Sequence, residues 1–271
     1  MPNAEKILLA CDVDATLAIE TLEIPKRNIE AINAFTEEGG LFVIATGRSP
    51  RSTKRFWNQI NACPRCVIFN GAGIYDFKTD TLLWKNMLKK EDFLPIIIGV
   101  RNRFPNVGIE FWHEGGIYQM TPGFDNTARE TVEGIKFLEA TTDMLPDECF
   151  KMLLSCKSET AEVNAFCSEI ASENVNVVCS SAYYCEILSS TSTKGAALKK
   201  LVEMTAPDAF VAAIGDYNND VEMLSYADFS AAPENAVEEA KNAADIIVCD
   251  CHVGAVADII EHLKNKNTEV L

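Results

Sequence analysis

The feature that most constrains this chain is an apolar run, Ile7–Cys11, that stops abruptly at two carboxylates, Asp12 and Asp14. A short apolar run bounded by polar residues is typical of a strand buried inside a parallel sheet. Such sheets bind ligands at the carboxyl ends of their strands, which is where these acids would lie. Two acids with a nearby hydroxyl, Thr16, suit Mg²⁺ and a phosphate, and an aspartate can also attack phosphorus.

This first motif by itself leaves two interpretations open. Asp12 could simply cap the end of a strand, while Asp14 and Thr16 make the hydrogen bonds of a turn. A pattern as short as D-x-D-x-T does not exclude this. The functional interpretation therefore depends on the other segments.

A second apolar run, Leu41–Ala45, ends in Thr46 and Gly47, just ahead of a Ser49-Pro50 pair. Serine as the cap and proline in the first turn predict that a helix begins there. Thr46 and Gly47 would then lie between the carboxyl end of a strand and the amino end of a helix, where free backbone N–H groups bind anions. An ordinary β–α turn without a ligand is the alternative for this segment.

A buried strand predicted at Phe210–Ile214 runs into Asp216, Asn219 and Asp220. One aspartate at such a place is a common helix cap, but capping does not readily explain all three side chains. Lys194, predicted near the start of another helix, stands where the helix dipole disfavours a cation, which makes it a candidate for binding an anion. The alternative for Lys194 is a solvated surface lysine.

The order of the predicted elements indicates the fold class. Strands alternate with helices in the first third of the chain and again after residue 188, which predicts an α/β fold with a doubly wound, Rossmann-like parallel sheet. Between these parts, hairpins alternate with helices, and one of these helices is predicted near Ala128–Glu139. This mixture predicts an inserted α+β domain. We therefore expect a core domain of residues 1–84 and 188–271 and an inserted domain of residues 85–187.

The composition narrows the possible partners. The chain carries 24 Lys and Arg against 40 Asp and Glu, a formal net charge of −16. A protein this acidic is repelled by nucleic acid and by anionic membranes. No apolar run reaches the ~20 residues of a membrane span, and the start of the chain shows no signal-peptide pattern. We therefore expect no nucleic-acid or membrane partner and a cytoplasmic location, and the oligomeric state is left open.

The ten cysteines are expected to be free thiols in a reducing compartment. Cys63 and Cys66 form a C-x-x-C pair, but no second pair stands at a spacing suited to a metal site. Both lie in the connection that leads into a strand, away from its carboxyl end. We therefore predict that neither cysteine is catalytic.

Four segments resemble, in order, the four motifs of the haloacid dehalogenase superfamily of phosphohydrolases. They are D-V-D-A-T-L at residues 12–17, A-T-G-R at 45–48, T-K-G-A-A-L at 193–198 and G-D-Y-N-N-D-V-E-M-L at 215–224. Asn70–Ala72 and the order of the inserted elements resemble the Cof-type branch, whose α/β cap lies between the second and third motifs. The chain departs from the family at Ala15, where glycine is usual, and at Thr191–Lys194, where Gly-Val-Ser-Lys is usual.

The resemblance implies a role for each motif. Asp12 would be the nucleophile, and Asp14 would protonate the leaving group and then activate water. Mg²⁺ would be held by Asp12, the backbone carbonyl of Asp14 and Asp216. Asp220 would orient these groups from outside the metal's own ligands. The residues that would bind the phosphoryl group are Thr46, Gly47, Lys194 and Asn219, with Arg48 as a further candidate.

These roles imply a Mg²⁺-dependent phosphatase of small phosphorylated metabolites, with sugar phosphates as one candidate class, acting through an aspartyl-phosphate. A sugar phosphomutase or phosphotransferase is the first alternative, which dependence on a bisphosphate activator would distinguish. A protein that binds a phosphate ligand without turnover is the second, and the intact Asp12 and Asp14 argue against it. The cap would close about hinges near Trp84–Asn86 and Ile187–Ser190 and would select the substrate.

Overall fold

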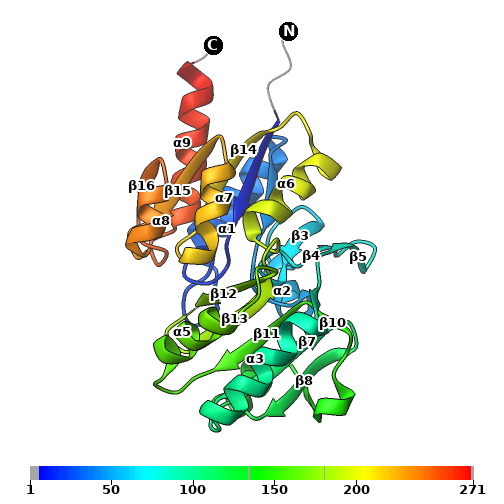
Figure 1. The fold of residues 1–271 in the computed structure, drawn as a ribbon. Helices are drawn as coiled ribbons and strands as arrows, with labels where there is room; N and C mark the ends of the chain where they lie inside the picture. The colour runs from blue at the N-terminus through cyan, green and yellow to red at the C-terminus, as the bar shows by residue number, and fades with distance from the viewer. Residues whose placement is uncertain (1–5, 134, 180, 270–271) are drawn as a thin grey trace. The chain divides into compact units, whose positions relative to one another are not determined.

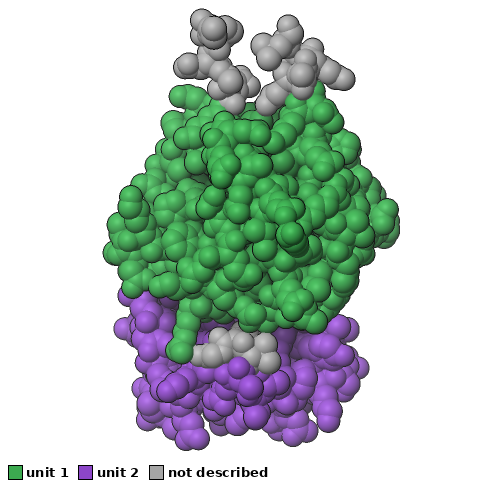
Figure 2. Space-filling view, turned by 180° about the vertical axis from the view of Figure 1, so that it is seen from behind, with its two compact units in different colours: residues 1–83, 193–271 green, residues 84–192 purple. Residues whose placement is uncertain are grey.

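The computed structural model describes residues 6–133, 135–179 and 181–269 (Figure 1). The chain divides into two compact units, which Figure 2 shows in different colours. Unit 1 consists of residues 1–83 and 193–271, and unit 2 consists of residues 84–192. Each unit has its own sheets and its own hydrophobic core.

Unit 1 is built on a five-stranded sheet in which every pair of neighbouring strands is parallel, in the order β16-β15-β14-β1-β2. The strands are β1 (Ile7–Cys11), β2 (Leu41–Ile44), β14 (Phe210–Ile214), β15 (Phe229–Pro233) and β16 (Ile246–Val248). β1 lies between β14 and β2, with Ile7 opposite Phe210 and Leu8 opposite Leu41. Because the strands all run the same way, their carboxyl ends share one edge of the sheet.

Past β2 the chain adds three further strands, which form a sheet of their own. They are β3 (Arg65–Ile68), β4 (Gly73–Asp76) and β5 (Thr81–Lys85). Ala45 and Val67 form a parallel bridge, so β3 continues the parallel order next to β2. The short 3₁₀ turn η1 (Phe69–Gly71) follows β3 and therefore lies at the same edge as the ends of β1 and β2.

Helices cover both faces of the parallel sheet (Figure 1). They are α1 (Lys26–Glu37), α2 (Pro50–Trp57), α6 (Lys194–Thr205), α7 (Val221–Tyr226), α8 (Glu238–Ala243) and α9 (Ala255–Glu269). Because strand side chains alternate between faces, Leu9 and Cys11 share one core with Ile32 of α1 and Ile259 of α9. From the other side, α7 instead contacts β14 and β15, and α8 contacts β15. This arrangement confirms the predicted α/β fold.

Two short segments shape the sheet edge. Ser49 caps α2 as predicted, because its hydroxyl accepts a hydrogen bond from the Ser52 N–H at 3.3 Å, and Pro50 is the first helical residue. The 3₁₀ turn η3 (Asn218–Asp220) leads directly into α7. Both helices therefore begin next to the carboxyl end of a strand.

Unit 2 contains a six-stranded sheet in the order β12-β13-β11-β7-β8-β9, antiparallel except for the parallel pair of β8 and β9. Its strands are β7 (Gly108–His113), β8 (Gly116–Thr121), β9 (Phe137–Glu139), β11 (Lys151–Ser155), β12 (Val175–Cys179) and β13 (Tyr184–Ser189). The other elements are the strand pair β6 (Leu88–Lys89) and β10 (Glu148–Cys149), helices α3 (Lys90–Arg103), α4 (Asn126–Glu133) and α5 (Thr160–Ile170), and the 3₁₀ turn η2 (Thr142–Met144). Over the described residues, no helix of either unit is both long enough and apolar enough to cross a membrane.

The two faces of the unit 2 sheet differ in chemistry. Phe111, Met152 and Ile187 belong to an apolar core that they share with residues of α3 and α5. The alternate positions carry charges, with Glu110 and Glu186 both opposite Leu153 on the central strand β11. One face of this sheet is therefore a conventional core, and the other is a polar surface that is largely buried.

The helix predicted near Ala128–Glu139 is wrong in its second half. α4 ends at Glu133, and Phe137–Glu139 forms β9, in which Phe137 lies opposite Ile117 of β8. The edge of β8 offers backbone hydrogen-bond partners that a longer helix would leave unused. Sheet pairing therefore outweighs the local preference for helix, which is only a weak guide.

Candidate active site

The carboxyl ends of β1 and β14 bring three buried aspartates together. Asp12 follows β1 and donates its N–H to the Ile214 carbonyl of β14 at 3.0 Å, so the two strand ends stay in register. Asp216 and Asp220 follow β14 through η3. One carboxylate oxygen from each of Asp12, Asp216 and Asp220 lies within 4.8 Å of the others. Residues more than 200 positions apart in the sequence thus form one acidic site.

Lys194 enters this site from the start of α6. Its Nζ donates to Asp12 Oδ1 and to Asp220 Oδ1, each at 2.7 Å, and its side chain is only 1% exposed. Burial alone would lower the pKa of Lys194, but the charges of Asp12 and Asp220 outweigh burial and raise it. The lysine is therefore a buried cation, and the solvated surface lysine considered as an alternative is wrong. We call Asp12, Lys194, Asp216 and Asp220 the acidic cluster.

Asp220 organises the loop beside it. Its Oδ2 accepts hydrogen bonds from the N–H groups of Asp216 and Tyr217, both at 3.1 Å, while its Oδ1 accepts from Lys194. A Cβ atom at Gly215 would lie 2.5 Å from the Asp220 side chain, so glycine is needed there. Asp220 thus positions both the lysine and the backbone that carries Asp216.

The charges of the acidic cluster do not balance. Burial, followed by the charge of Asp220, raises the pKa of Asp216 to about 7, although the Thr16 hydroxyl donates to Asp216 Oδ1 at 2.7 Å. Burial likewise raises the pKa of Asp12 well above the usual range, and the opposing charge of Lys194 does not cancel this effect. Three carboxylates around one ammonium group leave room for a further positive charge.

The end of β2 supplies the second predicted segment. Thr46 is fully buried, and its Oγ1 accepts a hydrogen bond from the Arg48 N–H at 3.2 Å. A Cβ atom at Gly47 would lie 2.9 Å from the Asn70 amide, so this position favours glycine. Asn219 Nδ2 donates to Asn70 Oδ1 at 2.9 Å. The structure therefore brings Thr46, Gly47 and Asn219 together around Asn70.

Asn70 belongs to a segment with unusual backbone geometry. Phe69, Asn70 and Gly71 have φ angles of 52°, 55° and 95°, in the left-handed region that disfavours side chains. A Cβ atom at Gly71 would lie 2.0 Å from the Thr193 carbonyl oxygen, so glycine lets η1 approach the start of α6 closely. The segment after β3 thus links the Gly47 loop to the helix that carries Lys194.

Asp14 is placed differently from Asp12. Its side chain is 53% exposed, and both of its oxygens accept hydrogen bonds from Arg48, at 2.9 Å from Nε and 2.6 Å from Nη2. Ala15, where the family usually has glycine, has a φ of 55°, so the left-handed conformation that a glycine would adopt freely is kept here at some cost. The Ala15 carbonyl accepts a hydrogen bond from Asn235 Nδ2 at 2.8 Å, which helps to hold this turn.

With this geometry, a family model described as haloacid dehalogenase-like hydrolase matches residues 9–260. This chain belongs to the haloacid dehalogenase-like hydrolases. The match covers the motifs of unit 1 and all of unit 2, so the predicted family and the predicted hydrolase class are confirmed.

Relatives within this family cover nearly the same length. The 5-amino-6-(5-phospho-D-ribitylamino)uracil phosphatase YitU of Bacillus subtilis is 24% identical over 249 residues, which are 88% of this chain and 90% of the relative. The pyridoxal phosphate phosphatase YbhA of Escherichia coli is 24% identical over 272 residues, 93% of this chain and 97% of the relative. A haloacid dehalogenase-like hydrolase from Bacillus subtilis has a similar solved fold, with a TM-score of 0.82 at 22% identity, over 94% of this chain and 99% of that one.

The donor atoms of the acidic cluster fit the metal expected for such a hydrolase. Asp12, Asp216 and Asp220 offer carboxylate oxygens that converge in a buried place. Oxygen ligands of this hard type suit Mg²⁺ and not a soft metal. Asp220 already accepts hydrogen bonds from Lys194 and two backbone N–H groups, which leaves Asp12 and Asp216 as the better placed metal ligands.

Two contributors to the site were not assigned from the sequence. The position of Asn70 next to Gly47 and Asn219 was not foreseen, although an Asn-Gly pair after a strand favours a left-handed turn. The bidentate pairing of Arg48 with Asp14 was also missed, because nothing in the separate motifs shows which side chains meet. Both contacts connect segments that lie far apart in the sequence.

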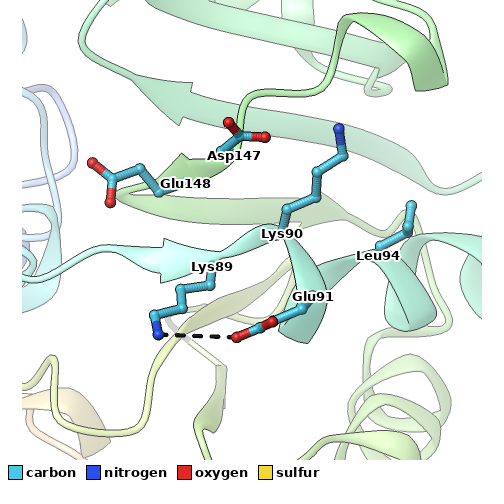
Figure 3. Close-up of a pocket in the computed structure, with 6 residues that line it drawn as sticks. All are labelled: Lys89, Lys90, Glu91, Leu94, Asp147 and Glu148. Atoms are coloured by element: carbon cyan, nitrogen blue, oxygen red, sulfur yellow. Dashed lines mark ion pairs between the residues drawn. The ribbon is translucent and has the colours of Figure 1, made fainter.

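Unit 2 also contains a pocket of about 550 Å³ (Figure 3). It is lined by Lys89, Lys90, Glu91, Leu94, Asp147 and Glu148. Three of its charged side chains are in ion pairs: Lys89 pairs with Glu91 at 3.9 Å, and Glu148 pairs with Lys85 at 2.9 Å. None of the predicted site residues lines this pocket, and it is not the candidate active site.

Proposed function

We propose that this protein is a Mg²⁺-dependent phosphatase of small phosphorylated metabolites that forms an aspartyl-phosphate on Asp12. The observation that carries the proposal is the acidic cluster, in which Lys194 holds the Asp12 carboxylate at 2.7 Å beside Asp216 and Asp220. Family membership supports the hydrolase class, and the phosphatase names of YitU and YbhA support a phosphate monoester as substrate.

In the proposed reaction an Asp12 oxygen attacks phosphorus, and the bond from phosphorus to the leaving alcohol breaks. Lys194 orients the attacking carboxylate and offsets its repulsion from the phosphate dianion. The carboxylates of Asp12 and Asp216 with the backbone carbonyl of Asp14 would hold Mg²⁺, which when bound keeps Asp12 ionised and neutralises phosphate charge. Thr46, the Gly47 N–H and Asn219 would bind the phosphoryl oxygens.

Asp14 would move the protons. Its exposed side chain would give a proton to the leaving alcohol and then take one from the water that attacks the aspartyl-phosphate. In the structure Asp14 is held by Arg48 through two hydrogen bonds. A substrate phosphate is an alternative partner for the Arg48 guanidinium, so we propose that substrate binding releases Asp14 for its role.

We further propose that the inserted domain, predicted at residues 85–187, selects the leaving group. The support within unit 2 is its polar sheet face, where Lys151 pairs with Glu186 at 2.8 Å and Arg129 pairs with Glu110 at 2.6 Å. Buried charged groups recognise hydrogen-bonding substrates more sharply than an apolar surface can. Exchanging residues 85–187 for those of a relative should therefore change the ranking of substrates and leave Mg²⁺ dependence unchanged.

The test is a screen of phosphorylated metabolites for released inorganic phosphate, with Mg²⁺ and with a chelator. We expect hydrolysis of one or more small esters only when Mg²⁺ is present, and inhibition by excess Ca²⁺, which accepts more ligands at longer distances. Turnover that requires a bisphosphate activator and releases no phosphate would instead identify a mutase. Full activity in the chelator would contradict the proposal.

A further inference from the structure

A second group of possible metal ligands lies in unit 1, outside the acidic cluster, in the loop between β16 and α9. Asp250, Cys251 and His252 are consecutive, yet they offer three different donors: a carboxylate oxygen, a thiol sulfur and a ring nitrogen. These donor atoms all lie within 4.8 Å of one another. We propose that this loop binds a Zn²⁺ ion through Asp250 Oδ1, Cys251 Sγ and His252 Nδ1.

The spacing of the donors supports this assignment. Cys251 Sγ lies 3.5 Å from His252 Nδ1. Zinc bonds of ~2.3 Å to sulfur and ~2.0 Å to nitrogen at a tetrahedral angle place these two atoms about 3.5 Å apart. Asp250 Oδ1 lies 2.7 Å from the same nitrogen, so it would have to move outward by a fraction of an ångström. The side chain of His252 is 52% exposed, which leaves it space to adjust.

The other nitrogen of the His252 ring has the partner that a metal ligand needs. His252 Nε2 lies 2.9 Å from Glu20 Oε2, a carboxylate from a distant part of the chain. A metal-bound histidine usually donates its second ring N–H to a carboxylate, which fixes the ring and makes it a better ligand. Glu20 therefore orients His252 so that its Nδ1 faces Asp250 and Cys251.

A simpler explanation accounts for only part of this arrangement. A protonated His252 between Asp250 and Glu20 would be a surface ion pair, and such pairs contribute little to stability. It would not explain why the buried Cys251 places its sulfur at the same nitrogen. On binding zinc, the Cys251 thiol and His252 Nδ1 would each lose a proton to solvent, and both vacated electron pairs would bind the metal.

The loop also has a direct connection to the candidate active site. Asn235 Oδ1 accepts a hydrogen bond from the Cys251 N–H at 2.9 Å, and Asn235 Nδ2 donates to the Ala15 carbonyl at 2.8 Å. Ala15 follows Asp14 directly. The mixed donors separate this site from the acidic cluster, since sulfur and imidazole favour zinc whereas oxygens alone favour magnesium.

The experiment uses the full chain with Co²⁺ as a spectroscopic probe, followed by Zn²⁺ in competition with a chromophoric chelator. We expect tetrahedral Co²⁺ absorption with a thiolate-to-metal charge-transfer band, displaced by one equivalent of Zn²⁺. Cys251→Ser should remove the charge-transfer band. His252→Gln should weaken Zn²⁺ binding by more than ~100-fold, and Glu20→Gln, which removes only the orienting partner, by ~10–100-fold.

Cys249→Ser is the matched control, because Cys249 lies in the same loop but its sulfur interacts with Arg27 at 3.7 Å. This variant should bind zinc like the wild type. Because Cys251 is buried and its replacement could disturb folding, the half-exposed His252 provides the second, independent variant. Absence of a thiolate band in the wild type, or a band and zinc affinity that persist in His252→Gln, would overturn the proposal.

Discussion

Each unit of this molecule buries a group of four charged side chains, and the two groups differ in their balance. The acidic cluster of unit 1 contains three carboxylates and one ammonium group. In unit 2, the group formed by Glu110, Arg129, Lys151 and Glu186, which we call the paired cluster, contains two carboxylates and two cations. Both groups are almost completely removed from solvent.

The balance of charge separates a buried group that is satisfied by its own ion pairs from one that favours a bound ion. A balanced set of ion pairs satisfies itself and tends to fix one conformation, although it adds little net stability. An excess of one sign is unfavourable unless an opposite charge binds. Burial first, and then the charge of Asp220, raises the pKa of Asp216 to about 7. We infer that the acidic cluster suits a further cation, whereas the charges of the paired cluster already balance.

Asp12→Asn should reduce activity more than any other substitution considered for either cluster. The amide keeps nearly the same shape but is a poor nucleophile and a poor ligand for Mg²⁺, so phosphate release should fall by ~10⁴-fold or more. A thermal melt in the same buffer should still show one cooperative transition. Turnover near the wild-type rate in a cleanly purified sample would remove Asp12 from the role of nucleophile.

The comparison itself is tested by removing one cation from each cluster. Lys194→Met and Lys151→Met should each lower the free energy of unfolding by ~3–5 kcal/mol, because each leaves a carboxylate buried without its partner. In Lys194→Met, added Mg²⁺ should raise the melting temperature more than it does in the wild type. In Lys151→Met the effect of Mg²⁺ should equal that in the wild type.

A double variant provides the control for unit 2. Lys151→Met combined with Glu186→Leu removes both charges of one pair and should recover most of the lost stability, since an apolar pair can replace a buried ion pair. If Mg²⁺ rescued Lys151→Met as strongly as Lys194→Met, the distinction between an unbalanced and a balanced cluster would be wrong.

A smaller effect is expected from pH. An unfolded aspartate has a pKa of ~3.9, whereas Asp216 in the folded chain has a pKa of about 7. Between these values the folded state binds the additional proton, so the stability of the metal-free protein should fall as pH rises from 5 to 8. Melting temperatures in chelator should show a decrease of several degrees, and Mg²⁺ should reduce it.

Asp216→Asn is the control for that measurement, because it removes one of the two buried carboxyl groups with a raised pKa and should make the pH dependence in chelator shallower, leaving the part that Asp12 contributes. An equally steep decrease in this variant would assign the effect to other carboxyl groups. A stability that rises between pH 5 and 8 in the metal-free wild type would contradict the shifted pKa of Asp216.

The smallest effect is expected at Cys63 and Cys66, which are buried in unit 1 but lie outside the acidic cluster. Burial raises the pKa of both thiols, so neither is a ready nucleophile at neutral pH. Replacing both with serine should leave the rate of phosphate release within a few-fold of the wild type. A loss as large as that of Asp12→Asn would require a thiol or zinc mechanism.

The sequence was most informative where a residue departed from what its local segment favours, such as an acid at the end of an apolar run or a lysine at the amino end of a helix. Apolar runs that stop at Asp12, Thr46 and Asp216 predicted three strand ends at one edge. Lys194, placed against a helix dipole, was predicted to bind an anion. In the structure its ammonium group contacts two carboxylates of the chain, those of Asp12 and Asp220, and the binding of a phosphate stays a prediction. These are properties of single segments, which a sequence can display.

Contacts between segments were beyond such reasoning. The pairing of Arg48 with Asp14 and of Asn219 with Asn70 depends on how separate loops meet at the sheet edge. The polar sheet face of unit 2 is visible in the sequence only as three charged residues within apolar segments, Glu110, Lys151 and Glu186. That these three charges share one face of the sheet became clear only from the register of the strands.

The pairing of β1 with β14 also affects the order in which the two units can fold during synthesis. Ile7 and Phe210 lie opposite each other, yet all of unit 2 is translated between them. Until β14 has been synthesised, one edge of β1 has no partner strand. Because domains generally fold as units, we expect residues 84–192 to fold before the parallel sheet of unit 1 is complete. A chain that stops before residue 210 should contain a protease-resistant unit 2 and a protease-sensitive unit 1, and resistance of residues 6–83 would contradict this. The part of the protein proposed to choose the substrate would thus exist before the part proposed to cleave it.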